Sequence, residues 1–70
     1  MWIRSQDKKI LTEIHDLEID SANQIWGSGS LIGEYSTEEK ALKVLDEIQK
    51  QTEYLCHKAF QMPQDEDVDV

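Results

Sequence analysis

Three side chains of this sequence, His15, Cys56 and His57, have the metal-binding or nucleophilic chemistry that zinc sites and many enzymes use. Cys56 and His57 are adjacent, and neighbouring helical side chains project about 100° apart, so they do not easily bind one ion. A Cys–His nucleophilic pair would require His15 beside Cys56, with an orienting group such as Asp16. The sequence does not support that contact, so we expect no metal, no cofactor and no catalytic residues.

A glycine-rich segment at residues 27–33 invites comparison with phosphate-binding loops. Its pattern is G-x-G-x-x-x-G, whereas the dinucleotide fingerprint is G-x-G-x-x-G, and no Gly-Lys-Ser/Thr follows it. The residues after it alternate as in a strand. We therefore interpret Gly27-Ser28-Gly29-Ser30 as a hairpin loop.

The elements that would position any site begin with one amphipathic helix, predicted over residues 37–60. Ser36 and Glu39 have the spacing of a capping box at its start, and Pro63 cannot continue a helix at its end. Its apolar side chains recur at steps of three and four, at Ala41, Val44, Leu45, Ile48, Leu55, Cys56 and Ala59.

Short apolar runs separated by turn-forming residues precede this helix and predict strands. Residues 10–21 also fit a helical stripe through Ile10, Ile14 and Leu17, but we favour strands with a bulge or turn near His15. In the last strand, Leu31, Gly33 and Tyr35 are expected on one face. The predicted strands are residues 2–5, 10–12, 17–20, 24–26 and 31–35.

Together these elements predict an α+β fold, in which a small antiparallel sheet of four to five short strands is covered by one long C-terminal helix. Residues 1–62 are expected to form this single domain and residues 63–70 a disordered acidic tail. Removing the four tail carboxylates from the formal net charge of -8 leaves -4 for the domain.

Charge and composition narrow the function classes. A net acidic chain repels polyanions, so direct nucleic-acid binding is disfavoured, and we interpret the cluster of Arg4, Lys8 and Lys9 as protection of an edge strand. No run of about 18 apolar residues and no secretory h-region is present, and Cys56 is the single cysteine. We therefore expect a soluble, cytoplasmic protein with no membrane association.

Two segments carry a resemblance to a known group of proteins. Residues 1–9 read Met-Trp-Ile-Arg-Ser-Gln-Asp-Lys-Lys, and residues 31–48 read Leu-Ile-Gly-Glu-Tyr-Ser-Thr-Glu-Glu-Lys-Ala-Leu-Lys-Val-Leu-Asp-Glu-Ile. This resembles small uncharacterised bacterial and phage-borne proteins, which open with an aromatic-Ile-Arg-Ser/Thr-Gln-Asp strand and carry a Leu-Gly-x-Tyr strand before a Glu-rich helix. Ile32 departs from that pattern. The resemblance implies a sheet followed by a helix and no known activity.

A single helix covers one face of a sheet, so the expected fold leaves the other face free for a partner. For Trp2 and Trp26, two arrangements are equally favoured: one tryptophan lies in the core and the other in the interface, or both are buried. We expect a non-enzymatic protein–protein interaction module that binds a protein or a second copy through a free sheet face or edge, with no small-molecule substrate. The alternative is an acidic inhibitor that mimics a polyanion and occupies the basic groove of a nucleic-acid-binding protein. The candidate interface residues are Trp2, Ile3, Arg4, Ile25, Trp26 and Ile32.

Overall fold

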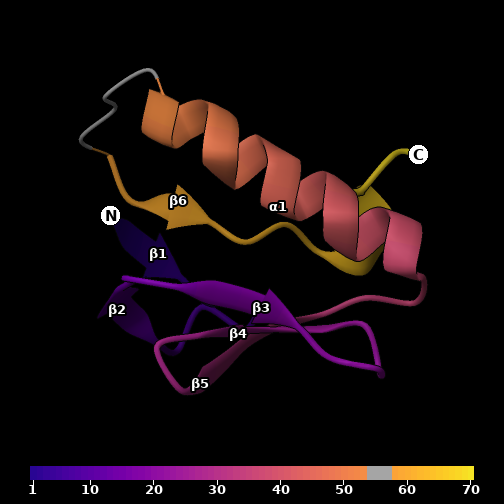
Figure 1. The fold of residues 1–70 in the computed structure, drawn as a ribbon, viewed down its shortest axis with the longest axis horizontal. Coiled ribbons are helices and arrows are strands. Elements are labelled where there is room, and N and C mark those ends of the chain that lie inside the picture. The colour runs from indigo at the N-terminus through magenta and orange to yellow at the C-terminus, as the bar shows by residue number, and fades with distance from the viewer. Residues whose placement is uncertain (54–57) are drawn as a thin grey trace.

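The computed structural model describes residues 1–53 and 58–70 and has an α+β fold with six short strands and one α-helix in that part of the chain (Figure 1). Five strands lie close to their predicted positions, so strands at residues 10–21 are confirmed and the helical alternative is wrong. The expected four to five strands are corrected to six. In chain order the elements are β1 (Trp2–Arg4), β2 (Leu11–Glu13), β3 (Leu17–Ile19), β4 (Gln24–Gly27), β5 (Ser30–Glu34), α1 (Glu38–Glu53), β6 (Phe60–Gln61) and the 3-10 helix η1 (Asp65–Asp67).

The strands form two small sheets instead of the single expected sheet. Their orders are β2-β1-β6 and β3-β4-β5. Every pair is antiparallel except β1 and β6, which run parallel with Ile3 opposite Phe60. Parallel strands need a long crossover connection, and the segment of chain that joins β1 to β6 contains α1. The helix is therefore in the middle of the chain and not at its C-terminal end.

The hairpin loop predicted between β4 and β5 is confirmed. Ser28 and Gly29, its central residues, have φ angles of 48° and 85°. Two successive positive φ angles are typical of the type I′ turn, whose twist matches that of the strands it joins. Glycine adopts such an angle without steric cost, which explains its presence at position 29.

A bulge in β5 changes which side chains face inward. The pairing shifts between Ile25 opposite Gly33 and Trp26 opposite Leu31, so Ile32 is the extra residue. Leu31 consequently shares the outer face with Trp26, whereas Ile32 and Gly33 both lie in the interior. The expectation that Leu31 and Gly33 share one face is therefore wrong.

The start of α1 is capped by a different residue from the one predicted. Thr37 Oγ1 accepts a hydrogen bond from the Lys40 amide at 3.2 Å, so the cap lies one residue after Ser36. The helix is described to Glu53, and Phe60 lies in a strand, so the prediction of helix as far as residue 60 is wrong. Leu55, Cys56 and His57 lie outside the described residues.

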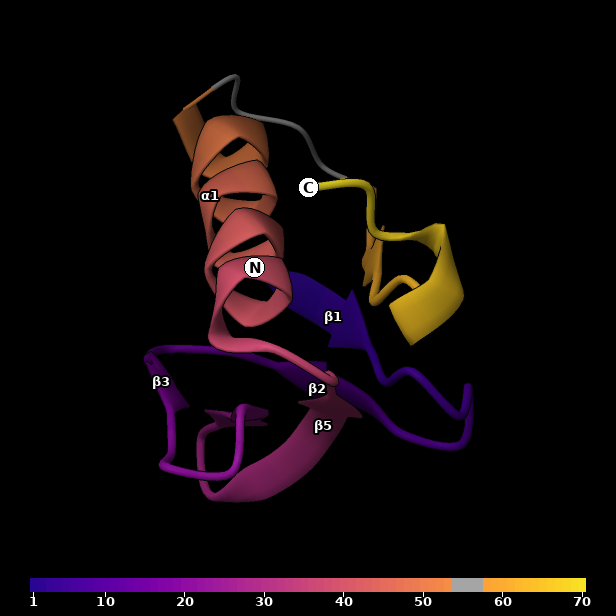
Figure 2. The same cartoon turned by 90° about the vertical axis from the view of Figure 1, so that its right-hand side faces the viewer.

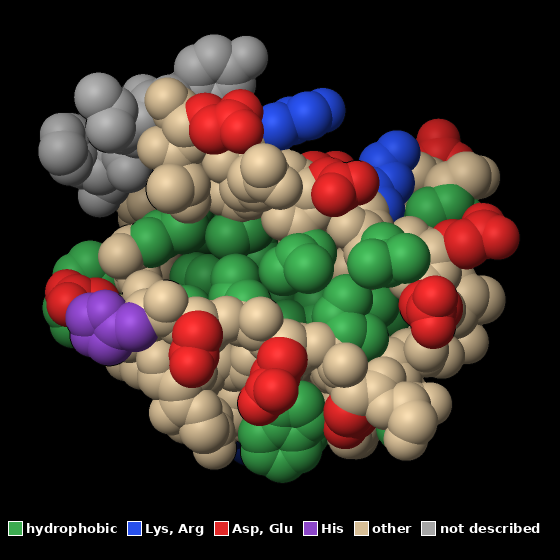
Figure 3. All heavy atoms as spheres, viewed as in Figure 1, with side chains coloured by type: hydrophobic (Ala, Val, Ile, Leu, Met, Phe, Trp, Pro, Cys, Tyr) green, Lys and Arg blue, Asp and Glu red, His purple; other side chains and the backbone are tan. Residues whose placement is uncertain are grey.

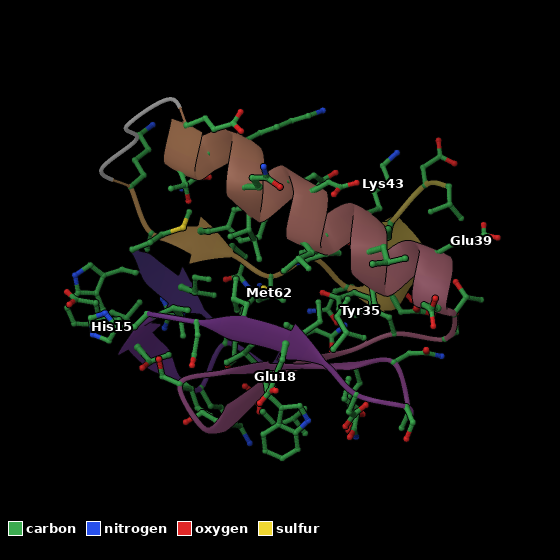
Figure 4. The ribbon with its side chains drawn as sticks, in the orientation of Figure 1. His15, Glu18, Tyr35, Glu39, Lys43 and Met62 are labelled. Carbon is green, nitrogen blue, oxygen red and sulfur yellow. The ribbon has the colours of Figure 1, made fainter. Side chains whose placement is uncertain are left out.

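One hydrophobic core joins both sheets and the helix. Figure 4 shows Tyr35 and Met62 between α1 and the strands, and both are buried there. The expected inward stripe of α1 is confirmed at three positions, Ala41, Val44 and Ile48. The buried members of this core are Ile3, Ile14, Ile25, Ile32, Tyr35, Ala41, Val44, Ile48, Met62 and Val68.

The acidic tail packs on the domain, which differs from the disordered tail expected for residues 63–70. Val68 is only 7% exposed, and Asp65 accepts a 2.8 Å hydrogen bond from the Ser36 amide. Lys40 Nζ donates to the Asp65 carbonyl and lies 3.5 Å from its carboxylate. The tail therefore binds beside the start of α1, on the opposite side of the helix from β3 (Figure 2).

Gln6 links the two sheets and the tail. Its amide nitrogen donates to the Ile32 carbonyl at 2.8 Å. Its side chain donates to the Glu34 carbonyl and accepts from the Glu34 amide, both at 2.9 Å. The same Nε2 donates to the Pro63 carbonyl at 3.2 Å, and Gln64 Nε2 donates to the Gln6 carbonyl at 2.7 Å. A primary amide thus pairs with β5 as a backbone peptide group would.

Candidate interaction surfaces

The predicted interface residues fall into two groups. Ile3, Ile25 and Ile32 are at most 1% exposed, so they belong to the core and cannot contact a partner while the fold is intact. This part of the predicted interface is wrong. The sequence suggested partner contacts because it assumed one sheet with an uncovered face, whereas two sheets and the helix enclose these side chains.

Trp2 and Arg4 do lie together, on the outer face of the β1–β2 hairpin. Both alternate with buried Ile3 and are exposed, Trp2 to 48%. Leu11 and Glu13 of β2 occupy the same face, because Glu13 pairs with Trp2 and Leu11 pairs with Arg4. We call these four residues the Trp2 face. A 57% exposed Leu11 beside an exposed tryptophan gives this face more apolar surface than a single stray side chain provides.

Glu13 and Leu11 were missed as interface candidates. The signal that identifies them is the turn at residues 7–9, where the Asp7 carboxylate accepts hydrogen bonds from Ser5 Oγ at 2.6 Å and the Lys9 amide at 2.9 Å. These bonds hold the pKa of the Asp7 carboxyl below its usual range, the Ser5 bond contributing most. A fixed turn sets the strand register and therefore the residues opposite Trp2 and Arg4.

Trp26 lies on the outer face of the second sheet, apart from Trp2, and is partly buried. Its indole Nε1 donates to Asp20 Oδ2 at 2.9 Å, while Asp20 Oδ1 accepts from the Gln24 and Ala22 amides. The bond from Trp26, followed by that from Gln24, lowers the pKa of the Asp20 carboxyl. This hydrogen bond therefore holds the indole ring by its polar edge. Glu18 of β3 lies directly opposite Trp26 of β4.

A band of apolar side chains lies open to solvent between α1 and β3, with carboxylates along both margins (Figure 3). From β3 it includes Leu17 and Ile19, which are partly buried and pack against the core. We call this surface the α1–β3 band. Asp16 and Glu18 alternate with Leu17 and Ile19 and are exposed, so acidic groups border the band along β3.

The edge of β3 that faces this band is an unpaired sheet edge. β3 is the outermost strand of its sheet, and two backbone bonds, from the Asp20 amide to Gln24 and from the Ser28 amide to Asp16, point residues 16 and 20 toward β4. Alternate residues of an antiparallel strand point their peptide groups in opposite directions. Leu17 and Ile19 consequently direct their N–H and C=O groups outward. Among the described residues, no hydrogen bond joins these groups to another element.

Two further depressions lie on the described surface. One of about 210 Å³ separates the β1–β2 turn from β5, lined by Ser5, Gln6, Asp7, Leu31, Ile32, Gly33 and Glu34. The other, of about 520 Å³, lies on the outer side of α1 against the C-terminal residue, lined by Glu39, Leu42, Lys43, Asp46, Glu47, Lys50 and Val70. Lysines and acids alternate in the second depression, so α1 offers no continuous row of carboxylates there.

His15 lies beside the β4–β5 hairpin loop (Figure 4), and its backbone amide donates to Ser28 Oγ of that loop. Its Nε2 is 3.8 Å from Glu13 Oε1. Asp16, considered as an orienting group for His15, instead accepts the Ser28 amide with Oδ1 at 3.2 Å. Cys56 and His57 lie outside the described residues, so the contact between His15 and Cys56 that a nucleophilic pair would require, and that the sequence does not support, is not tested. Within residues 1–53 and 58–70, no three His, Cys, Asp or Glu side chains are grouped closely enough to hold a metal ion.

Comparison with known proteins adds no family. Neither the models of protein families nor the curated proteins nor the solved structures gave a match to this chain. The described part of the chain also contains no helix of the length and apolarity needed to cross a membrane.

Proposed function

We propose that this protein is a non-enzymatic interaction module that binds an extended segment of a partner protein along the free edge of β3. The observation that carries the proposal is the outward direction of the Leu17 and Ile19 peptide groups beside the α1–β3 band. An added strand would hydrogen-bond to this edge through its backbone.

The side chains around the edge define the chemistry of the partner. A strand paired with β3 continues the same alternation, so its inward residues lie beside Leu17 and Ile19 and its outward residues beside Asp16 and Glu18. Apolar side chains suit the first set of positions and basic side chains the second. The partner segment would therefore alternate lysine or arginine with apolar residues.

Synthetic seven-residue peptides test this proposal with the full chain. Isothermal titration calorimetry would compare an alternating Lys-Val peptide with a permuted peptide of the same composition and with an alternating Glu-Val peptide. We expect binding of the alternating Lys-Val peptide alone, because only it matches both the pairing and the charge. Equal binding of the permuted peptide would remove the strand-pairing argument.

Two charge reversals provide a matched pair of variants. Glu18→Lys places a positive charge at the edge, and we expect it to weaken peptide binding about fivefold. Asp67→Lys makes the same change on η1, across the helix from β3 (Figure 2), and is expected to leave affinity unchanged. Equal losses in both variants would indicate attraction to net charge without a defined site.

The polyanion mimic is the alternative proposal, and the same experiment tests it. A mimic binds through charge alone, so it would take the permuted peptide as well and lose affinity steeply with salt. The acidic side chains of α1 give it less support than the β3 edge gives to strand addition, because Lys43 and Lys50 lie among them.

A further inference from the structure

We propose that the Trp2 face binds the same face of a second copy of this chain, forming a twofold symmetric dimer. This surface is separate from the β3 edge, because β1–β2 and β3 belong to different sheets. The dimer therefore does not depend on the partner proposed above.

The register of the hairpin supplies the geometric argument. Trp2 is opposite Glu13 and Arg4 is opposite Leu11, so the four side chains occupy the corners of a rectangle, about 5 Å across the strands and about 7 Å along them. The apolar pair, Trp2 and Leu11, lies on one diagonal. The charged pair, Arg4 and Glu13, lies on the other.

Two such rectangles can be paired face to face about four twofold axes in their plane: one along the strands, one across them and one along each diagonal. About a diagonal, the two corners off the axis meet with an offset of about 3 Å, which the long side chains of Arg4 and Glu13 can span. About the Trp2–Leu11 diagonal, each apolar residue meets its own copy, and Arg4 meets Glu13 of the second copy in both directions. The other diagonal puts Arg4 on Arg4, and the remaining two axes put Glu13 on an apolar residue. One axis alone therefore matches every corner, as an isologous interface requires.

The charged corners have groups free to make this contact. Arg4 Nε donates to the Lys8 carbonyl at 3.0 Å, which fixes the guanidinium while its terminal nitrogens can still donate to a carboxylate. The Glu13 side chain is 50% exposed, and its one described ionic neighbour is His15 at 3.8 Å. Each copy would thus contribute one donor and one acceptor to two reciprocal ion pairs.

The area available sets the expected strength. A stable dimer of standard size buries about 800 Å² on each partner, which is one-sixth of the 4793 Å² surface of this chain. The four residues provide less than that. We therefore expect a weak dimer, with a dissociation constant above about 1 µM.

Sedimentation equilibrium of the full chain between about 10 µM and 1 mM tests the proposal. We expect a concentration-dependent shift from monomer to dimer, and Trp2→Ala should raise the dissociation constant by about tenfold or more. Leu42→Ala truncates a 45% exposed leucine on α1 and serves as the matched control, with no expected change. A monomer throughout this range, or an equal effect of both variants, would overturn the proposal.

Exchanging the two charges distinguishes the symmetric pairing from non-specific association. Arg4→Glu and Glu13→Arg each place like charges together across the axis, so each alone should raise the dissociation constant about tenfold. The double variant restores opposite charges and should return it to within about threefold of the original value. Thermal unfolding by circular dichroism checks that each variant is folded. Failure of the double variant, when folded, to recover dimerisation would refute this axis.

Discussion

Replacing Tyr35 by phenylalanine should lower stability at neutral pH and raise it in alkali, relative to the unchanged chain. Tyr35 is 5% exposed, and its hydroxyl donates to the Pro63 carbonyl at 2.8 Å. Phenylalanine keeps the ring but loses this bond. Because Gln6 Nε2 still donates to the same carbonyl, at 3.2 Å, we expect a loss of about 1 kcal/mol in the free energy of unfolding at pH 7.

The alkaline part of the prediction follows from the pKa of the Tyr35 hydroxyl. Burial raises this pKa well above its usual range, and the charges of Asp65 and Glu47 raise it further. A raised pKa means that the folded state holds its proton more tightly than the unfolded state. The contribution of Tyr35 to the free energy of unfolding is therefore complete below the usual tyrosine pKa of about 10, and it falls above that pH by about 1.4 kcal/mol per pH unit.

Combining the two effects gives a crossing point. The 1 kcal/mol advantage of tyrosine at pH 7 should be cancelled at about pH 10.7, and Tyr35→Phe should be the more stable form beyond it. Urea unfolding followed by far-UV circular dichroism at pH 7, 9, 10 and 11.5 measures both curves. Lysine titration affects both proteins alike and cancels in the difference. A stability difference that stays constant with pH would refute the reasoning.

Three further perturbations test other contacts. Gly33→Ala should destabilise the fold by about 1–3 kcal/mol in urea unfolding, because an added Cβ would lie 3.0 Å from Tyr35 Cε2. Asp65→Asn should flatten the loss of stability below about pH 4, since a backbone amide bond lowers the pKa of this carboxyl and its stabilisation disappears as pH falls through that pKa. Trp26→Phe removes the indole donor, so the pKa of Asp20, measured by NMR titration, should rise toward its usual value.

The first five strands could be predicted because local signals determine them. The loop at Ser28 and Gly29 is typical of one turn type, and Trp2, Ile3 and Arg4 alternate with burial as a strand of period two requires. The hairpin turns then fix most of the pairing. This much of the fold depends on neighbours a few residues apart along the chain.

The predictions failed where distant segments meet. Phe60 and Gln61 are too few to show a periodic pattern, yet they pair with β1 at the other end of the chain. The sequence of the tail shows only a run of acidic residues, which is typical of a disordered segment. Asp65 finds its partners, the Ser36 amide and Lys40, only once the chain is folded. A β-bulge at Ile32 likewise arises from pairing with β4 and not from a local sequence signal.

The arrangement of the core changes where partner contacts are expected. With a single sheet under one helix, an entire sheet face would need covering, and Ile3, Ile25 and Ile32 would be interface residues. Two sheets that meet through Gln6 enclose those side chains instead. The remaining apolar exposure is local, at the Trp2 face and along the α1–β3 band. Association should therefore be weak, reversible and sensitive to single substitutions on these surfaces, because the core does not require a partner for its burial.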